Sequence, residues 1–306
     1  MPVTWAEYRA TAILFMMFVV TMVTALMLVP AFTVAGLDQT FEDSNDWKNA
    51  IWYVALVLVF TMLILAIAKW GKKAIIQFII LGAVASVIFY VVYGLWVGNS
   101  ANPPYTFAAL VGLGLGIAGA VLLYFHPEWY VIDATGLVMA AGSAAIFGIS
   151  LAVWPVIVLL VLLAIYDAIA VYKTKHMLAL ADTVIDLRLP VLMVIPKHGG
   201  YSFRSETAAF KKANKENKGE REAMFMGLGD LVMPSILVVS AYKFGFEAWG
   251  MWPVLGAAVG TLAGFLILMT FVLRGNPQAG LPLLNGGSIL GFLIALYASN
   301  QTLMFW

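Results

Sequence analysis

Two aspartates of this chain, Asp167 and Asp230, lie within apolar runs long enough to be buried in a lipid bilayer. The other acidic residues are expected in polar loops or at the edges of apolar runs. A carboxylate at the centre of a membrane helix costs roughly 3 kcal/mol on insertion scales, so such groups persist mainly where they have a function. Asp167 and Asp230 are therefore the first candidates for chemistry.

Two carboxyl groups within about 3 Å of each other cannot both be ionised, so they hold one proton between them. The ionised group can take a proton from water while the neutral group donates one to a carbonyl oxygen. These two steps hydrolyse an amide without a covalent intermediate or a metal ion. The neighbouring residues suit this reaction, because Gly227 and Gly229 leave room beside Asp230 for a substrate backbone. Tyr166 offers a hydroxyl group beside Asp167.

The composition indicates a polytopic membrane protein. Of the 306 residues, 63% are hydrophobic and 11% are charged, and the mean hydropathy is +0.95. In a soluble domain about a quarter of the residues are charged. A net charge of +1 argues against nucleic-acid binding. The chain has no cysteine and its three histidines lack the spacing of metal ligands, so we expect neither a metal nor another cofactor.

Nine apolar stretches are long enough to cross a bilayer, which takes about 20 residues per helix. They cover residues 10–30, 50–69, 74–97, 106–126, 133–152, 154–173, 223–243, 251–273 and 282–300. The predicted fold class is an all-α polytopic membrane protein with nine transmembrane helices. We expect six helices in residues 1–173, a partly flexible cytoplasmic loop in 174–222 and three helices in 223–306, acting together as one functional unit.

The basic residues predict how these helices are oriented, because Lys and Arg gather on the cytoplasmic side. With the N-terminus inside, fifteen of the seventeen basic residues are cytoplasmic, ten of them in the long loop counted together with Lys173 just before it. Only Lys48 and Lys243 lie outside, and the first outer loop is acidic. The C-terminus is then outside as well.

This orientation places the two aspartates at a similar depth. Asp167 precedes Lys173 by six residues, or about 9 Å of helix, and Asp230 follows Glu222 by eight residues, or about 12 Å. Both carboxyl groups therefore lie in the cytoplasmic half of the bilayer. Nothing in the chain prevents their helices from being neighbours.

The long loop contains one apolar, β-prone run, which proline residues bracket at Pro190 and Pro196. An unwound substrate exposes backbone groups that lipid cannot hydrogen-bond. A strand containing Val191, Val194 and Ile195 would satisfy them by strand addition. The alternative is a buried re-entrant or interfacial segment without a role in substrate binding.

A glycine-rich run, Gly112-Leu-Gly-Leu-Gly116-Ile-Ala-Gly119, lies within the fourth apolar stretch. No strand precedes it, so a nucleotide-binding loop is a poor interpretation and close helix packing is the better one.

Three short motifs resemble those of presenilin and the signal peptide peptidases. Tyr166-Asp167 on the sixth predicted helix is similar to the YD motif, and Gly227-Leu228-Gly229-Asp230 on the seventh is similar to the GxGD motif. Gly280-Leu-Pro282-Leu283-Leu284, entering the ninth, resembles the PAL motif, with Leu283 where the family has alanine. The compact loops and short N-terminus look most like an archaeal presenilin homologue.

The resemblance implies a presenilin-like fold and an intramembrane aspartyl protease that cuts transmembrane helices within the bilayer. Asp167 and Asp230 would be its catalytic pair. From their place on the same side of the membrane as both acids, Pro282 and Leu284 are expected to hold the other flank of the substrate.

Two other functions remain open from the residues alone. A proton-coupled transporter could use the two acids as a relay, although such proteins often show internal repeats and none is visible here. A prepilin-peptidase-like enzyme also carries GxGD but does not need the Pro282 motif. A packing protein without activity would not explain two costly acids.

Overall fold

The computed structural model describes residues 4–38, 41, 43–70, 73–174, 192–198, 200–203, 223–274 and 278–299. In this part of the chain, nine helices are long and apolar enough to cross a membrane, as predicted. They are α1 (Trp5–Val34), α2 (Lys48–Lys69), α3 (Lys73–Gly98), α4 (Tyr105–Phe125), α5 (Trp129–Ser150), α6 (Val153–Ile169), α9 (Leu228–Trp249), α10 (Trp252–Val272) and α11 (Gly280–Ala298). A π-helical turn, η1 (Ala170–Thr174), continues α6.

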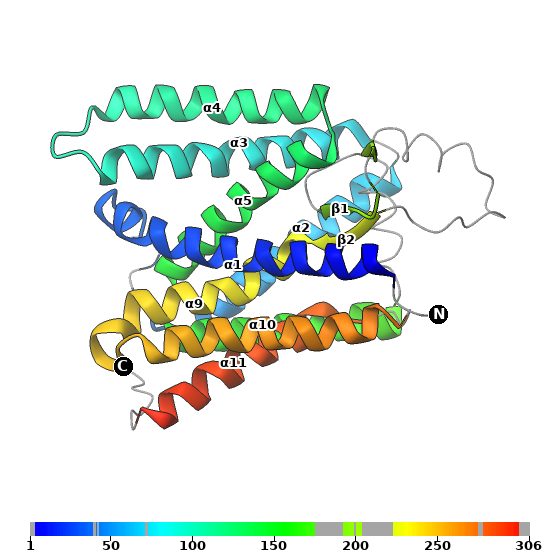
Figure 1. Cartoon of the computed structure of the whole chain (residues 1–306). Helices are drawn as coiled ribbons and strands as arrows, with labels where there is room; N and C mark the ends of the chain where they lie inside the picture. Colours follow the sequence, from blue (N-terminus) through cyan, green and yellow to red (C-terminus); the bar gives the residue numbers. More distant parts are fainter. Residues whose placement is uncertain are drawn as a thin grey trace.

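The helices α1, α5 and α9 lie between two outer pairs, α3 with α4 and α10 with α11 (Figure 1). Burial follows this arrangement. In α9, 61% of the residues in its apolar 18-residue stretch are buried inside the protein, and in α5 the share is 56%. The corresponding share is only 11% for α2 and α3. The apolar faces of the peripheral helices are therefore left to lipid, and the protein core forms around α5 and α9.

Glycines bring the outer helix pairs into close contact. Along α10 and α11, a side chain at Gly260 would collide with the backbone carbonyl of Gly287, so only glycine permits this approach. In α4, a side chain at Gly112 or Gly116 would meet Phe89 or the carbonyl of Ala85 in α3. The interpretation of this glycine-rich run as a helix-packing surface is thus confirmed.

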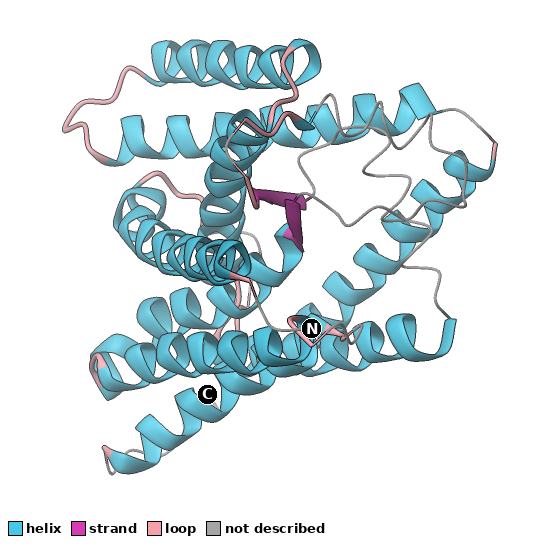
Figure 2. Ribbon diagram, turned by 45° about the vertical axis from the view of Figure 1, so that its right-hand side comes forward, coloured by secondary structure: helices cyan, strands magenta, loops and turns pink. Residues whose placement is uncertain are grey.

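A two-stranded antiparallel sheet completes the described fold (Figure 2). Strand β1 (Leu192–Pro196) pairs with β2 (Ala223–Gly227), with Val194 opposite Phe225. The strand expected between Pro190 and Pro196 is confirmed for Leu192–Pro196. Residues 175–191, which include Pro190 and Val191, lie outside the described residues.

The second strand corrects one predicted boundary. Residues 223–227 were expected to begin the seventh helix, but they form β2, and α9 begins only at Leu228. A short apolar run is compatible with a helix or a strand, and here its pairing with β1 stabilises the strand. The first helix also begins earlier than predicted, because Thr4 and Glu7 form a capping box at its N-terminus.

Candidate active site

Asp167 lies near the end of α6, just before the regular helix becomes the π-helical turn η1. Its side chain is buried, whereas Tyr166 beside it is half-buried. The N–H of Ala170, the first residue of η1, donates to the main-chain carbonyls of Tyr166 and Asp167. Helices change to π geometry mostly in single turns, and often at functional sites. The turn therefore marks the part of α6 that departs from a simple membrane helix.

Asp230 is the third residue of α9 and lies directly after the sheet. Gly227, the last residue of β2, is the N-cap of this helix, and the carboxyl group of Asp230 hydrogen-bonds back to its backbone. Helix N-termini carry unpaired N–H groups and a partial positive charge, both of which favour a carboxylate. Asp230 is thus positioned by the end of a strand rather than within a continuous helix.

The N-terminus of α11 brings the two aspartates together. The N–H of Leu281 donates to Oδ2 of Asp167 at 3.1 Å, and the backbone of Gly280 also hydrogen-bonds to this carboxyl group. A methyl group at Gly280 would lie only 3.1 Å from Oδ1 of Asp230. Both carboxyl groups therefore meet at Gly280, close enough for the charges of Asp167 and Asp230 to repel each other.

The hydroxyl group of Tyr172 extends the contacts of this region. It accepts a hydrogen bond from the N–H of Ala279, the N-cap of α11, at 3.5 Å. The π-helical turn thus supports the same helix end that holds Asp167. Sequence reasoning chose Tyr166 as the tyrosine of interest and did not consider Tyr172.

The other predicted site residues differ in how far they are buried. Gly229 is exposed and Leu228 is half-buried, whereas Leu284 is fully buried and supports α11 from within the core. Pro282 is the third residue of α11, in its first turn, where the missing N–H of proline leaves no helical bond unmade. Val194 is buried in β1.

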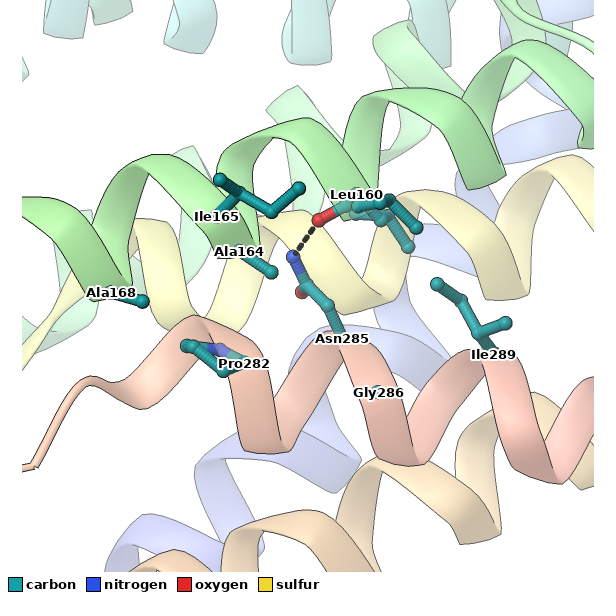
Figure 3. A pocket seen from close by; sticks show the side chains of 9 residues that line it. Leu160, Ala164, Ile165, Ala168, Pro282, Asn285, Gly286 and Ile289 are labelled. Carbon is teal, nitrogen blue, oxygen red and sulfur yellow. Dashed lines mark hydrogen bonds between the residues drawn. The ribbon is translucent and has the colours of Figure 1, made fainter.

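An apolar groove of ≈ 270 Å³ lies between α6 and α11 (Figure 3). Ala164 and Ala168, which flank Asp167 on α6, line one wall, and Pro282 lines the other. Asn285 donates from Nδ2 to the carbonyl of Leu160 at 3.0 Å, which fastens α11 to α6 along the groove. The groove therefore extends along α6 from Ala168, the residue after Asp167, to Leu160.

Sequence reasoning missed one buried acid. Asp133 was placed at the edge of the fifth predicted helix, but α5 begins four residues earlier at Trp129, and the Asp133 side chain is only 4% exposed. Its Oδ1 accepts a hydrogen bond from the N–H of Val194 in β1 at 2.8 Å. The apolar residues on both sides of Asp133 were the signal that could have identified it.

Comparison with known proteins identifies the family of this chain. The model of a family described as signal-peptide peptidase, presenilin aspartyl protease matches residues 15–301. The chain belongs to this family. Its members hydrolyse peptide bonds with aspartates, and the chain is accordingly an intramembrane aspartyl protease of the presenilin type. The transporter and prepilin-peptidase alternatives are not favoured.

Two solved structures of presenilin-family intramembrane aspartate proteases resemble this family member over nearly their whole length. One, in a C222 crystal form, has 34% sequence identity and a TM-score of 0.66, with 94% of this chain and 99% of that chain covered. The other, in a P2 crystal form, has 37% identity and a TM-score of 0.62, with coverages of 93% and 96%. A search of the curated proteins gives no significant match.

The close approach at Gly280 gives the first prediction for this presenilin-family protease. In Gly280→Ala the new methyl group must displace the carboxyl group of Asp230, which lies 3.1 Å from it. The carboxyl group must move by a few tenths of an ångström, so we expect kcat/KM to fall by up to roughly tenfold, since a misplacement of about 1 Å can cost 10²-fold. The measurement is cleavage of a single-span substrate in detergent.

The matched control is Gly114→Ala on α4, where an added methyl group meets nothing within 4 Å. This variant should retain the unaltered rate. A Gly280→Ala protein that cleaves at that same rate would show that the contact with Asp230 does not matter.

Proposed function

We propose that Asp167 and Asp230 are the catalytic pair and that together they activate water to hydrolyse peptide bonds of transmembrane helices. The single observation that supports this assignment is their meeting at Gly280, from α6 on one side and from the start of α9 on the other. Repulsion between the two carboxyl groups favours a state in which they hold one proton.

The proposed reaction proceeds by general acid–base catalysis. The ionised carboxylate removes a proton from water as the water oxygen attacks the scissile carbonyl carbon, and the protonated carboxyl group donates to the carbonyl oxygen. The resulting tetrahedral diol then collapses. As its C–N bond breaks, a diol hydroxyl gives a proton to the ionised carboxylate and the leaving nitrogen takes a proton from the other carboxyl group, so the pair again holds one proton. Backbone N–H groups of Gly280 and Leu281 hold Asp167 in place throughout.

The substrate must be unwound before this chemistry, because a helix has already bonded the backbone groups around its scissile carbonyl. We propose that the unwound segment extends the sheet β1–β2, which ends three residues before Asp230. Val194 lies within this sheet, and Val191 lies outside the described residues. The apolar groove beside Pro282 is suited to the other flank of the substrate.

The orientation and the division of the chain belong to the same proposal. The N-terminus and the loop 174–222 are placed in the cytoplasm and the C-terminus outside. Two ion pairs are consistent with this sidedness, because Glu7 of α1 contacts Lys197 after β1, whereas Lys243 of α9 contacts Asp38 after α1. Residues 1–173 supply Asp167 and residues 223–306 supply Asp230, so the two helical parts act as one unit.

The catalytic pair is tested by Asp167→Asn and Asp230→Asn. Each variant should lose at least about 10³-fold in kcat, because a general acid–base group typically contributes 10²–10⁴-fold and the pair acts as one device. Cleavage of a single-span substrate is measured together with thermal unfolding in detergent. Asp46→Asn, the same chemical change in a loop, should leave the rate unaltered. A substantial rate in folded Asp167→Asn would overturn the assignment.

The shared proton predicts a bell-shaped dependence of kcat/KM on pH. Activity should fall at low pH, when both carboxyl groups are protonated and none can activate water. It should fall again at high pH, when the pair has lost the proton that it donates. Initial rates are measured in buffers of constant ionic strength, with tryptophan fluorescence as a check of folding at each pH. A flat profile from acidic to neutral pH would argue against carboxylate chemistry.

The proposed strand addition is tested at Met193, whose N–H faces β2. Met193→Pro removes this donor and should sharply lower cleavage of transmembrane substrates, with less effect on a short soluble peptide that needs no unwinding. Met193→Ala shortens the side chain but keeps the N–H. It therefore separates the effect of losing the hydrogen-bond donor from the effect of losing the side chain. Equal losses on both substrates, or none on either, would leave the strand as a packing element only.

A further inference from the structure

Asp133 takes no part in the proposed chemistry, yet it is a buried acid within a membrane-spanning helix. Its Oδ1 accepts from the N–H of Val194 at 2.8 Å, and its Oδ2 has no hydrogen-bond partner among the described residues. An intramembrane acid is costly, and this one joins two segments that are 61 residues apart in the chain. The bond between α5 and β1 therefore calls for an explanation beyond packing.

The bond occupies the outer edge of β1. In an antiparallel pair, the N–H groups of successive residues point alternately toward the partner strand and away from it. Because the N–H of Val194 points to Asp133, those of Met193 and Ile195 point to β2. Lipid offers no partner for an outward N–H of a strand. Asp133 satisfies this donor and fixes the strand against α5 at the residue opposite Phe225.

A second contact one turn along α5 reinforces the first. A methyl group at Gly136 would lie 2.9 Å from the sulfur of Met193 and 3.5 Å from Cδ1 of Leu228. The same face of α5 therefore touches both β1 and the first residue of α9. Beyond β1, the carbonyl of Lys197 accepts a hydrogen bond from Arg9 at 3.0 Å. The strand is thus held at its centre by α5 and at its end by α1.

The sheet links the position of β1 to the position of Asp230. The register pairs Leu192 with Gly227, the N-cap residue to which the carboxyl group of Asp230 returns. A shift of β1 along α5 would move β2, and with it the start of α9. We infer that Asp133 is a positioning residue that sets the register of the sheet relative to Asp230, and so selects which peptide bond of the substrate is cut.

The inference rests on the proposed catalytic pair and adds a determinant of cleavage position to it. What Asp133 supplies is one acceptor oxygen, because Oδ1 alone has a partner among the described residues. An amide oxygen supplies the same acceptor. Asp133→Asn should therefore preserve the function, whereas Asp133→Leu, of similar size but without an acceptor, should not.

The experiment compares these two variants with the unaltered chain on one single-span substrate. Products are mapped by mass spectrometry, and kcat/KM is measured alongside. Asp133→Asn is expected to keep the cleavage positions and a rate within about threefold. Asp133→Leu is expected to spread cleavage over neighbouring peptide bonds and to lower kcat/KM roughly tenfold, because the N–H of Val194 loses its partner.

A merely structural role for Asp133 would lower the yield or the rate without moving the cleavage positions. Should Asp133→Leu fail to fold, Val194→Pro removes the same hydrogen bond from the other side. Proline at position 194 deletes an N–H that does not face β2, so the ladder remains intact. It is expected to spread the cleavage positions as Asp133→Leu does.

Two results would overturn the inference. One is an unaltered cleavage position in folded Asp133→Leu or Val194→Pro protein. The other is the same altered pattern in Asp133→Asn and Asp133→Leu, since the charge rather than the acceptor would then be responsible. Asp230→Asn is run in parallel. If it remains active, the catalytic pair itself fails; if it is inactive while the cleavage positions stay fixed in the other variants, only the role of Asp133 fails.

Discussion

The site depends on one constraint, which is that lipid cannot hydrogen-bond a backbone N–H group. A helix that begins inside the membrane leaves such groups unpaired. Here α9 and α11 both begin near the aspartates, and carboxyl groups take the N–H groups that they expose. The carboxyl group and the helix N-terminus stabilise each other, because the carboxyl group needs hydrogen-bond donors and the N–H groups of the helix end need acceptors. Asp167 and Asp230 can therefore remain at a depth where isolated acids would be unfavourable.

The start of α11 must be held firmly for this arrangement to persist, and three helices hold it. Glycines bring α11 against the backbone of α10, and Asn285 donates to the carbonyl of Leu160 in α6. Ser288 donates to the carbonyl of Pro234 in α9 at 3.5 Å. Two of these three neighbours carry an aspartate. Contacts further along α11 thus keep the helix end and both carboxyl groups in one place.

Much of this arrangement could be predicted from residue types and spacing. Nine apolar stretches give nine helices in the described residues, and the apolar run before Pro196 gives a strand. The start of α9 could not be predicted, because Ala223–Gly227 has no clear period of its own and becomes a strand only by pairing with β1. The role of Gly280 was hidden for a similar reason. Its importance comes from a carboxyl group 50 residues earlier in the chain.

The hydrogen bond from Leu281 to Asp167 has a consequence for biosynthesis. A ribosome makes α6 and α9 before α11, so Asp167 and Asp230 both enter the membrane before their common support exists. Until α11 inserts, Asp167 lacks these backbone donors, and only the packing of α6 against α9 relates its position to that of Asp230. The newly made chain therefore acquires its organised centre only after this helix docks. The incomplete chain is therefore expected to lack proteolytic activity until α11 has inserted.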